Sequence, residues 1–228
     1  MRLTIGYITA LAITLLIFCQ AIIIPSFFMP FFRHQFASLG VAETIQVSDE
    51  DLMYVTVGLL DYMRGRRDTL DGITAVVAGV EREFYSDLEK RHMVDVRVLY
   101  DILFMVRNIT VFVVIALILL MALFKYPILQ TLARCTREVL TGFLILLALL
   151  VIVIVIDFDR AFYIFHRIFF DNDYWLLNPH VDLLINMVPI YFFIDISIFI
   201  AAIMVLVPIA ISIAATLYLR NKNRRLVQ

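Results

Sequence analysis

Two histidine-containing segments carry the side chains best suited to proton transfer. The first holds His92 and Asp95, and the second runs from His166 through Asn172 to Trp175. Each segment lies beside a stretch that is long and apolar enough to cross a bilayer. Because an imidazole takes up and returns a proton near neutral pH, paired histidines at the lipid–water boundary have the chemistry needed to act on a lipid ester.

His92 and Asp95 are spaced i, i+3 in a stretch with helical periodicity. Residues at this spacing share one face of a helix, so a carboxylate can hold one imidazole nitrogen and fix the tautomer of the ring. The alternative is a solvated face, because the run from Glu89 to Arg97 is rich in charge. If the pair is catalytic, we expect Asp95 to orient His92.

The second segment places His166, Asn172 and Asp173 among aromatic residues that include Phe169 and Trp175. Aromatic residues favour the membrane interface, so much of this segment is expected to act as an anchor. A histidine and acids buried among aromatic rings nevertheless need polar partners, because an unpaired buried charge is costly. This requirement indicates a functional site.

Further along the chain, Asn178 and Pro179 break the helical pattern next to His180 and Asp182. Asp182 is a candidate hydrogen-bond partner for a neighbouring imidazole. His180 ranks below His92 and His166, because a turn alone can explain its position. His34 follows an apolar stretch directly, which is typical of an interface residue.

A zinc site is the competing chemical interpretation. Imidazole and carboxylate groups ligate zinc, and the candidate ligands are His92, His166, His180, Asp95 and Asp182. The chain has no His-Glu-x-x-His or Cys-x-x-Cys pattern, and no Gly-x-Ser-x-Gly motif of a serine hydrolase. We therefore expect no metal and no cofactor.

The composition is that of an integral membrane protein. Hydrophobic residues make up 63% of the 228 residues, against about 45–50% in soluble domains. A net charge of -1, with no basic run interleaved with aromatic residues, gives no support for a nucleic-acid partner. Cys19 falls in an apolar stretch and Cys135 in a polar loop, so we expect neither a disulfide nor a cysteine metal site.

Four stretches are long enough to span the membrane, which predicts an all-α, polytopic fold in a single integral membrane domain, 1–228. The predicted spans are residues 5–28, 108–125, 138–157 and 191–219. The first span has a charged start at Arg2, as a signal peptide would, but Ala-Ile-Ile-Ile-Pro is a poor cleavage site. We expect this helix to be retained.

Basic residues in the short loops predict the orientation of the spans. They gather at the amino terminus, in the expected loop 125–138 and in the tail 220–228. By the positive-inside rule, all three are expected to be cytoplasmic. Residues 32–107 and 158–190 then face outward from a bacterial cytoplasmic membrane.

The outer segment 32–107 is expected to contain two helices. Ser48 and Asp51 form the pattern of a capping box, and Gly65 is a plausible stop for the helix that follows. Ser86 and Glu89 form a second capping box, which begins a helix that is expected to run into the second span. Residues 64–68 are expected to form a solvated turn.

The chain resembles the bacterial integral membrane family of lipoprotein intramolecular transacylases (Lit). The resemblance lies in residues 89–96, in residues 165–175, in Asn178-Pro179, and in Asp182 and Pro189, together with the four-span arrangement. Arg97 stands where the family pattern leads us to expect lysine.

This resemblance implies a membrane acyltransferase. Its substrate would be a lipoprotein whose amino-terminal cysteine carries a diacylglyceryl group. The sn-2 acyl chain would move to the α-amine of the same cysteine and give a lyso-form lipoprotein. Membrane lipid is then a partner, and neither nucleotide nor metal is needed, because an ester is exchanged for an amide.

The resemblance also implies roles for the candidate residues. His92, oriented by Asp95, would act as the base, and His166 would protonate the leaving glyceryl oxygen or stabilise the oxyanion with help from Asn172. Trp175 and Phe169 would shape the lipid slot, with Asp173 and Asp182 in support. The rate is expected to rise with pH through the neutral range as a histidine loses its proton. A covalent acyl-histidine intermediate on either residue is an alternative to this mechanism.

Other functions would be compatible with the same four-span hydropathy pattern. A non-catalytic four-span sensor or scaffold would not explain two histidine–acid clusters at one membrane level. A membrane metal-dependent hydrolase would need the zinc ligands named above. A proton-coupled transporter is disfavoured, because the centres of the four spans lack ionisable residues.

Overall fold

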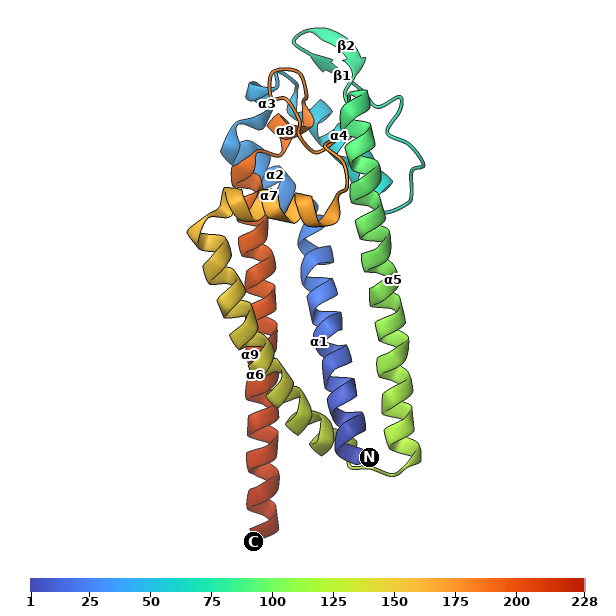
Figure 1. Ribbon diagram of the computed structural model, residues 1–228, viewed down its shortest axis with the longest axis vertical. Helices are drawn as coiled ribbons and strands as arrows, with labels where there is room; N and C mark the ends of the chain where they lie inside the picture. The colour runs from blue at the N-terminus through green and yellow to red at the C-terminus, as the bar shows by residue number, and fades with distance from the viewer. Residues whose placement is uncertain (228) are drawn as a thin grey trace. The chain divides into compact units, whose positions relative to one another are not determined.

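A computed structural model describes residues 1–227, and side chains as far as residue 224 (Figure 1). Its elements follow in the order α1 (Arg2–Ser26), α2 (Met29–Leu39), α3 (Val41–Thr44), α4 (Asp49–Met63), β1 (Thr74–Val77), β2 (Val80–Glu83), α5 (Asp87–Leu123), α6 (Ile128–Ile156), α7 (Phe158–Phe169), α8 (Leu184–Met187) and α9 (Ile190–Val227). The final residue of the expected tail, Gln228, lies outside the described residues.

Four helices, α1, α5, α6 and α9, are long and apolar enough to cross a membrane. The expected four-span, helical fold is therefore confirmed. Most of the expected loop 125–138 is helical, because α6 already begins at Ile128. The segment 158–190 also contains α7 and α8, and one residue, Asp157, separates α6 from α7.

The chain divides into two compact units. The first comprises residues 1–24, residues 104–158 and the chain from residue 198 onward, which include the apolar parts of the four long helices. Inside this unit Ala21, Leu147 and Met204 form a small buried cluster. Many of its large apolar side chains are exposed instead; Phe112, for example, is 72% exposed. Such exposure suits helices whose outer faces contact lipid.

Two hydrogen bonds within the first unit place three basic segments at one end. The Tyr7 hydroxyl donates to the Glu138 carboxylate. Near the carboxyl end of α9, Lys222 Nζ donates to Gln130 Oε1 over 2.7 Å. The starts of α1 and α6 and the end of α9 therefore lie together, as the predicted orientation requires.

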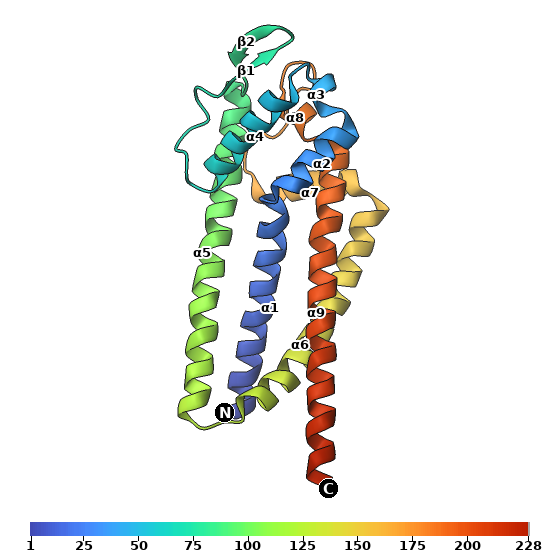
Figure 2. The same cartoon turned by 180° about the vertical axis from the view of Figure 1, so that it is seen from behind.

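The second unit, residues 25–103 and 159–197, has an apolar core of its own. Buried residues from α2, α4, the hairpin, the start of α5, α8 and the start of α9 contribute to it, including Phe32, Leu52, Tyr85, Met187 and Phe192. Within this unit α3 lies beside α8 (Figures 1 and 2). The core includes Met93 of α5, the residue that follows His92.

Ser48 caps α4 as predicted, and the predicted capping box at Ser86 is complete. Ser48 Oγ accepts a hydrogen bond from Asp51 N at 3.0 Å, where α4 begins. At the start of α5, Ser86 N donates to Glu89 Oε2 (2.6 Å) and Glu89 N donates to Ser86 Oγ (3.2 Å). As expected, α5 then continues without a break into its apolar part.

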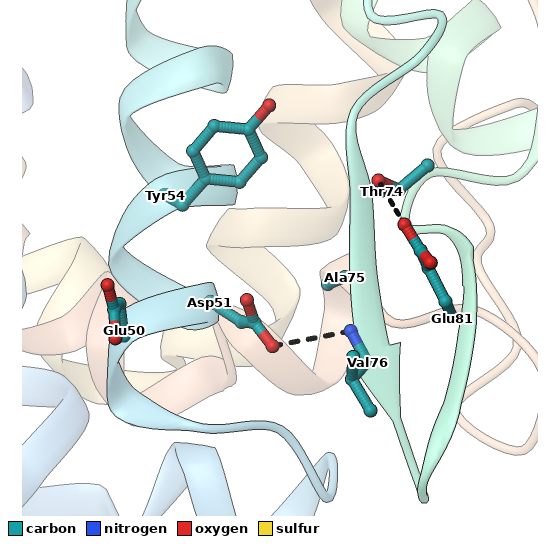
Figure 3. Close-up of a pocket in the computed structure, with 7 residues that line it drawn as sticks. All are labelled: Glu50, Asp51, Tyr54, Thr74, Ala75, Val76 and Glu81. Carbon is teal, nitrogen blue, oxygen red and sulfur yellow. Dashed lines mark hydrogen bonds between the residues drawn. The ribbon is translucent and has the colours of Figure 1, made fainter.

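An antiparallel hairpin, β1 and β2, lies between the two helices expected in the outer segment. Its turn uses Ala78 at φ 52° and Gly79 at φ 82°, the left-handed backbone that tight hairpin turns require. The hairpin docks on α4, where Asp51 Oδ2 accepts a hydrogen bond from Val76 N at 3.3 Å (Figure 3). The otherwise helical fold therefore contains one small sheet that was not predicted.

Candidate active site

The second unit brings His92 and His166 together. His92 lies in the second turn of α5 and His166 in the last turns of α7, and their ring centroids are 6.1 Å apart with an angle of 33° between the planes. The two segments are far apart in the chain, so their juxtaposition depends on the fold. The fold therefore places the two imidazoles beside each other.

His166 is 7% exposed, and its hydrogen bond defines a tautomer. Nδ1 lies 2.7 Å from the Phe162 carbonyl oxygen. A carbonyl oxygen only accepts, so Nδ1 carries the proton and the neutral ring leaves Nε2 free to accept one. Burial lowers the pKa of His166, while the Phe162 hydrogen bond opposes that change.

His92 differs in its hydrogen bonding. Its Nδ1 is buried and has no hydrogen-bond partner among the described residues. Burial lowers the pKa of His92 to about 4, the proximity of His166 adds to this effect and Asp95 opposes it. His92 is thus neutral at neutral pH, with a ring nitrogen left for a ligand.

Aromatic rings surround the two imidazoles. Trp175 stacks on His166 at 4.8 Å between centroids, and the Phe162 ring lies 4.2 Å from His166. Phe170 is 5.4 Å from His92 and 5.5 Å from His166. The sequence places Phe162 and Phe170 in an aromatic stripe with His166 at i, i+4, i+8 spacing, but they were not predicted as site residues.

A polar chain links the helix of His92 to the ring of His166. Asp95 Oδ2 accepts from Asn172 Nδ2 at 2.8 Å, and Trp175 Nε1 donates to the Asn172 carbonyl oxygen at 2.9 Å. The expectation that Asp95 holds the imidazole of His92 is wrong in this respect, because the carboxylate bonds to Asn172 while His92 Nδ1 is unpaired. The charge of Asp95 affects only the pKa of His92, whose lowering it opposes.

The remaining predicted residues lie around this centre without bonding to an imidazole. Asp173 is exposed and pairs with Arg167 at 3.6 Å. Asp182 is buried, but its oxygens accept from Ser86 Oγ (2.9 Å) and Asn178 N (2.8 Å). Among the described residues no hydrogen bond joins Asp182 to an imidazole, and its oxygens bind these other groups instead.

Phe169 and the two other histidines also lie apart from the paired imidazoles. Phe169 is 51% exposed and contacts the Phe165 ring at 4.7 Å. His34 and His180 are exposed. Among the described residues no group of three or more His, Cys, Asp or Glu side chains could hold a metal ion.

Comparison with known proteins agrees with this architecture. The chain is similar to the in meso structure of the membrane-integral lipoprotein intramolecular transacylase Lit from Bacillus cereus, at 19% identity and a TM-score of 0.72, covering 99% of this chain and 98% of that one. A structure of the same Bacillus cereus protein with a histidine-to-alanine mutation matches at 20% identity and a TM-score of 0.73, over 99% and 96% of the two chains.

The structure with a histidine-to-arginine mutation gives 20% identity and a TM-score of 0.71, over 100% and 95%. No match is found among curated proteins. The family model described as lipoprotein intramolecular transacylase Lit matches residues 7–193, which is most of the chain and includes both histidines. The chain therefore belongs to the Lit family of lipoprotein intramolecular transacylases, which are membrane acyltransferases.

Proposed function

We propose that this protein moves the sn-2 acyl chain of a diacylglyceryl-modified lipoprotein to the α-amine of its amino-terminal cysteine. The observation that carries the proposal is a pair of imidazoles 6.1 Å apart, with His166 buried and His92 half-buried. Both have lowered pKa values through burial, so both are available as proton acceptors at neutral pH. Family membership supplies the substrate class.

The reaction requires two proton transfers from one nitrogen. The α-ammonium loses one proton to become the attacking amine and a second as the new carbon–nitrogen bond becomes an amide. The ester carbon–oxygen bond breaks, and the leaving glyceryl oxygen gains one proton. We assign the first of these protons, which the α-ammonium loses to become the attacking amine, to Nδ1 of His92. His92 later releases this proton to water.

His166 carries the other proton. The neutral ring accepts it at Nε2, and the resulting imidazolium keeps its Nδ1–H bond to the Phe162 carbonyl. The ring then donates from Nε2 to the glyceryl oxygen, so the net release is one proton. Because amine and ester belong to one molecule, the enzyme needs only to hold them in an attack geometry.

Neighbouring residues support these roles. Asp95 fixes Asn172, and Asn172 fixes Trp175, which in turn stacks on His166. We assign Asn172 a further role as a donor near the developing oxyanion. Phe169, exposed on α7, would line the path of the acyl chain, and Asp173 would hold the adjoining loop through Arg167.

We place the site at the outer face of a bacterial cytoplasmic membrane, with both termini inside and membrane lipid around the spans. The basic segments at the amino terminus, around Lys125 to Arg137 and in the tail support this orientation. Their hydrogen-bonded association at one end of the first unit adds structural support. The substrate ester would then lie at the level of the histidines.

Alanine substitution tests the catalytic pair. His92→Ala and His166→Ala should each lower lyso-lipoprotein formation by about 10²–10⁴-fold, the contribution of a general acid or base. His180→Ala is the matched control, because His180 is exposed and should keep most activity. Mass spectrometry of lipoprotein amino termini measures the product, and immunoblotting checks protein level. Wild-type activity in both variants would remove the assignment.

Exhaustive chelation provides the second arm of this experiment. Activity that survives chelation supports acyl transfer by imidazoles alone. Activity lost on chelation and restored by zinc would instead favour a metal-dependent hydrolase.

A further inference from the structure

Two buried carboxylates and one half-buried serine join the first turn of α5 to the segment that follows α7. Glu89 is fully buried, and its two carboxylate oxygens accept from the backbone N–H groups of Leu184 and Ser86. Ser86 Oγ donates to Asp182 Oδ1 at 2.9 Å. We name Ser86, Glu89 and Asp182 the clamp.

Asp182 extends the clamp into its own loop. Its Oδ2 accepts from Asn178 N at 2.8 Å, and its backbone carbonyl accepts from Asn186 Nδ2 at 3.0 Å. Asp182 is 4% exposed, so these bonds form away from water. The clamp therefore fixes residues 178–186 against the start of α5 through hydrogen bonds as well as through apolar contact.

The clamp lies one helical turn before His92. One turn beyond His92, Asp95 bonds to Asn172. His92 thus sits between two points at which α5 is tied to the segment after α7. That same segment carries Trp175, which stacks on His166. The clamp and the Asp95–Asn172 hydrogen bond therefore both bear on the distance between the two imidazoles.

Stability alone does not explain such a cluster. Two carboxylates lie close together in the clamp, and burial, the largest influence, raises the pKa of Glu89 while the Leu184 and Ser86 N–H groups oppose it. Well-packed apolar residues often stabilise a core as well as buried ionic groups do. A directional network instead specifies one arrangement of two segments.

We propose that Ser86, Glu89 and Asp182 are positioning residues that hold the 172–184 segment against α5, so that His166 faces His92 at reacting distance. The proposal rests on the proposed acyl transfer. Loosening the clamp should lower kcat, because a misplacement of about 1 Å at a reacting centre can cost about 10²-fold in rate. Substrate capture by the lipid-facing surface should change little.

Conservative and disruptive substitutions separate positioning from bulk destabilisation. Glu89→Gln turns one acceptor toward a backbone N–H into a donor, and Asp182→Ala removes two acceptors. Asp182→Asn keeps both contacts, since its oxygen can accept from Asn178 N and its amide can donate to Ser86 Oγ. Lys90→Met is the matched control, because Lys90 bonds Asp71 and Glu83 near the hairpin at 2.7 Å each instead of the clamp.

The full-length protein in nanodiscs serves for two readouts, transacylation kinetics and NMR titration of labelled histidines. For Glu89→Gln and Asp182→Ala we expect kcat to fall about 10- to 100-fold at constant KM. The pKa of His92 should rise toward its usual 6.5, because the ring becomes solvated. Asp182→Asn and Lys90→Met should keep wild-type kcat and wild-type histidine pKa values, even where Lys90→Met lowers the melting temperature.

Wild-type kcat and unchanged histidine titration in Glu89→Gln and Asp182→Ala would overturn the proposal, as would equal losses in Lys90→Met. The two readouts also separate this proposal from the proposed function. If the wild-type protein forms no lyso-lipoprotein, the acyl-transfer assignment fails, while the histidine titration still decides whether the clamp positions the pair.

Discussion

At the scale of the residue, the two histidines differ in what holds them. His166 is oriented by a backbone carbonyl of its own helix, and His92 keeps Nδ1 unpaired. The sequence indicated both residues because histidine and acid recur beside apolar spans. It could not indicate the Phe162 carbonyl, since any residue supplies a carbonyl. The i, i+3 spacing likewise brought Asp95 near His92 without revealing that Asn172 takes its hydrogen bond.

The pKa of His92 gives a prediction about pH. With a folded value of about 4 against about 6.5 unfolded, the unfolded chain binds more protons between these limits. Stability should therefore be complete above pH 6.5 and fall as the pH drops toward 4, by roughly 3 kcal/mol at most. Histidine NMR and melting temperatures across this window check it, and an inflection of His92 near 6.5 would contradict it.

The lowered pKa of His92 also changes the explanation of the expected rise in rate with pH. A rise through the neutral range cannot reflect deprotonation of His92, which is already neutral there. It should instead follow the substrate's α-amine, whose usual pKa lies near about 7.7.

At the scale of the element, sequence patterns predicted those features that depend on residues close together in the chain, such as helix starts. Ser48 caps α4, the capping box at Ser86 is complete, and α5 runs into its span as expected. The hairpin was missed because each strand has only four residues and the turn begins with Ala78, which seldom adopts a positive φ. Its formation depends on docking to α4 through Asp51, a contact distant in sequence.

The hairpin turn provides a test at this scale. Gly79 has φ 82° and open space around it, so an added methyl group would meet only backbone strain. Gly79→Ala should destabilise the protein by about 1 kcal/mol, whereas Ala78→Gly relieves a strained backbone and should be neutral or stabilising. Thermal unfolding in detergent measures both. Equal melting temperatures for Gly79→Ala and the wild type would refute the assigned turn.

At the scale of the whole molecule, the hydropathy pattern was sufficient to predict four spans, because lipid permits only long apolar helices. The division into two units was not predictable in this way. The second unit relies on contacts among residues 25–103 and 159–197, and those contacts bring together segments that no local pattern connects.

Cysteine labelling tests the proposed orientation. Single cysteines at Asp71 and Asn178 should react with a membrane-impermeant thiol reagent on intact cells, because both positions belong to the segments proposed to face outward. A cysteine at Gln130, beside Lys222 at the basic end of the first unit, should react only after permeabilisation. Labelling of the Gln130 position alone would place both histidines inside the cell.

The single residue between α6 and α7 has a mechanical consequence. The uncharged part of α6, residues 139–156, is about 27 Å long at 1.5 Å per residue, close to the thickness of a hydrocarbon core. A helix that mismatches its bilayer responds by tilting. Only Asp157 separates α6 from α7, the helix of His166, so the chain has no longer loop at this end of the span. The thickness of the surrounding bilayer is therefore expected to bear on the start of α7.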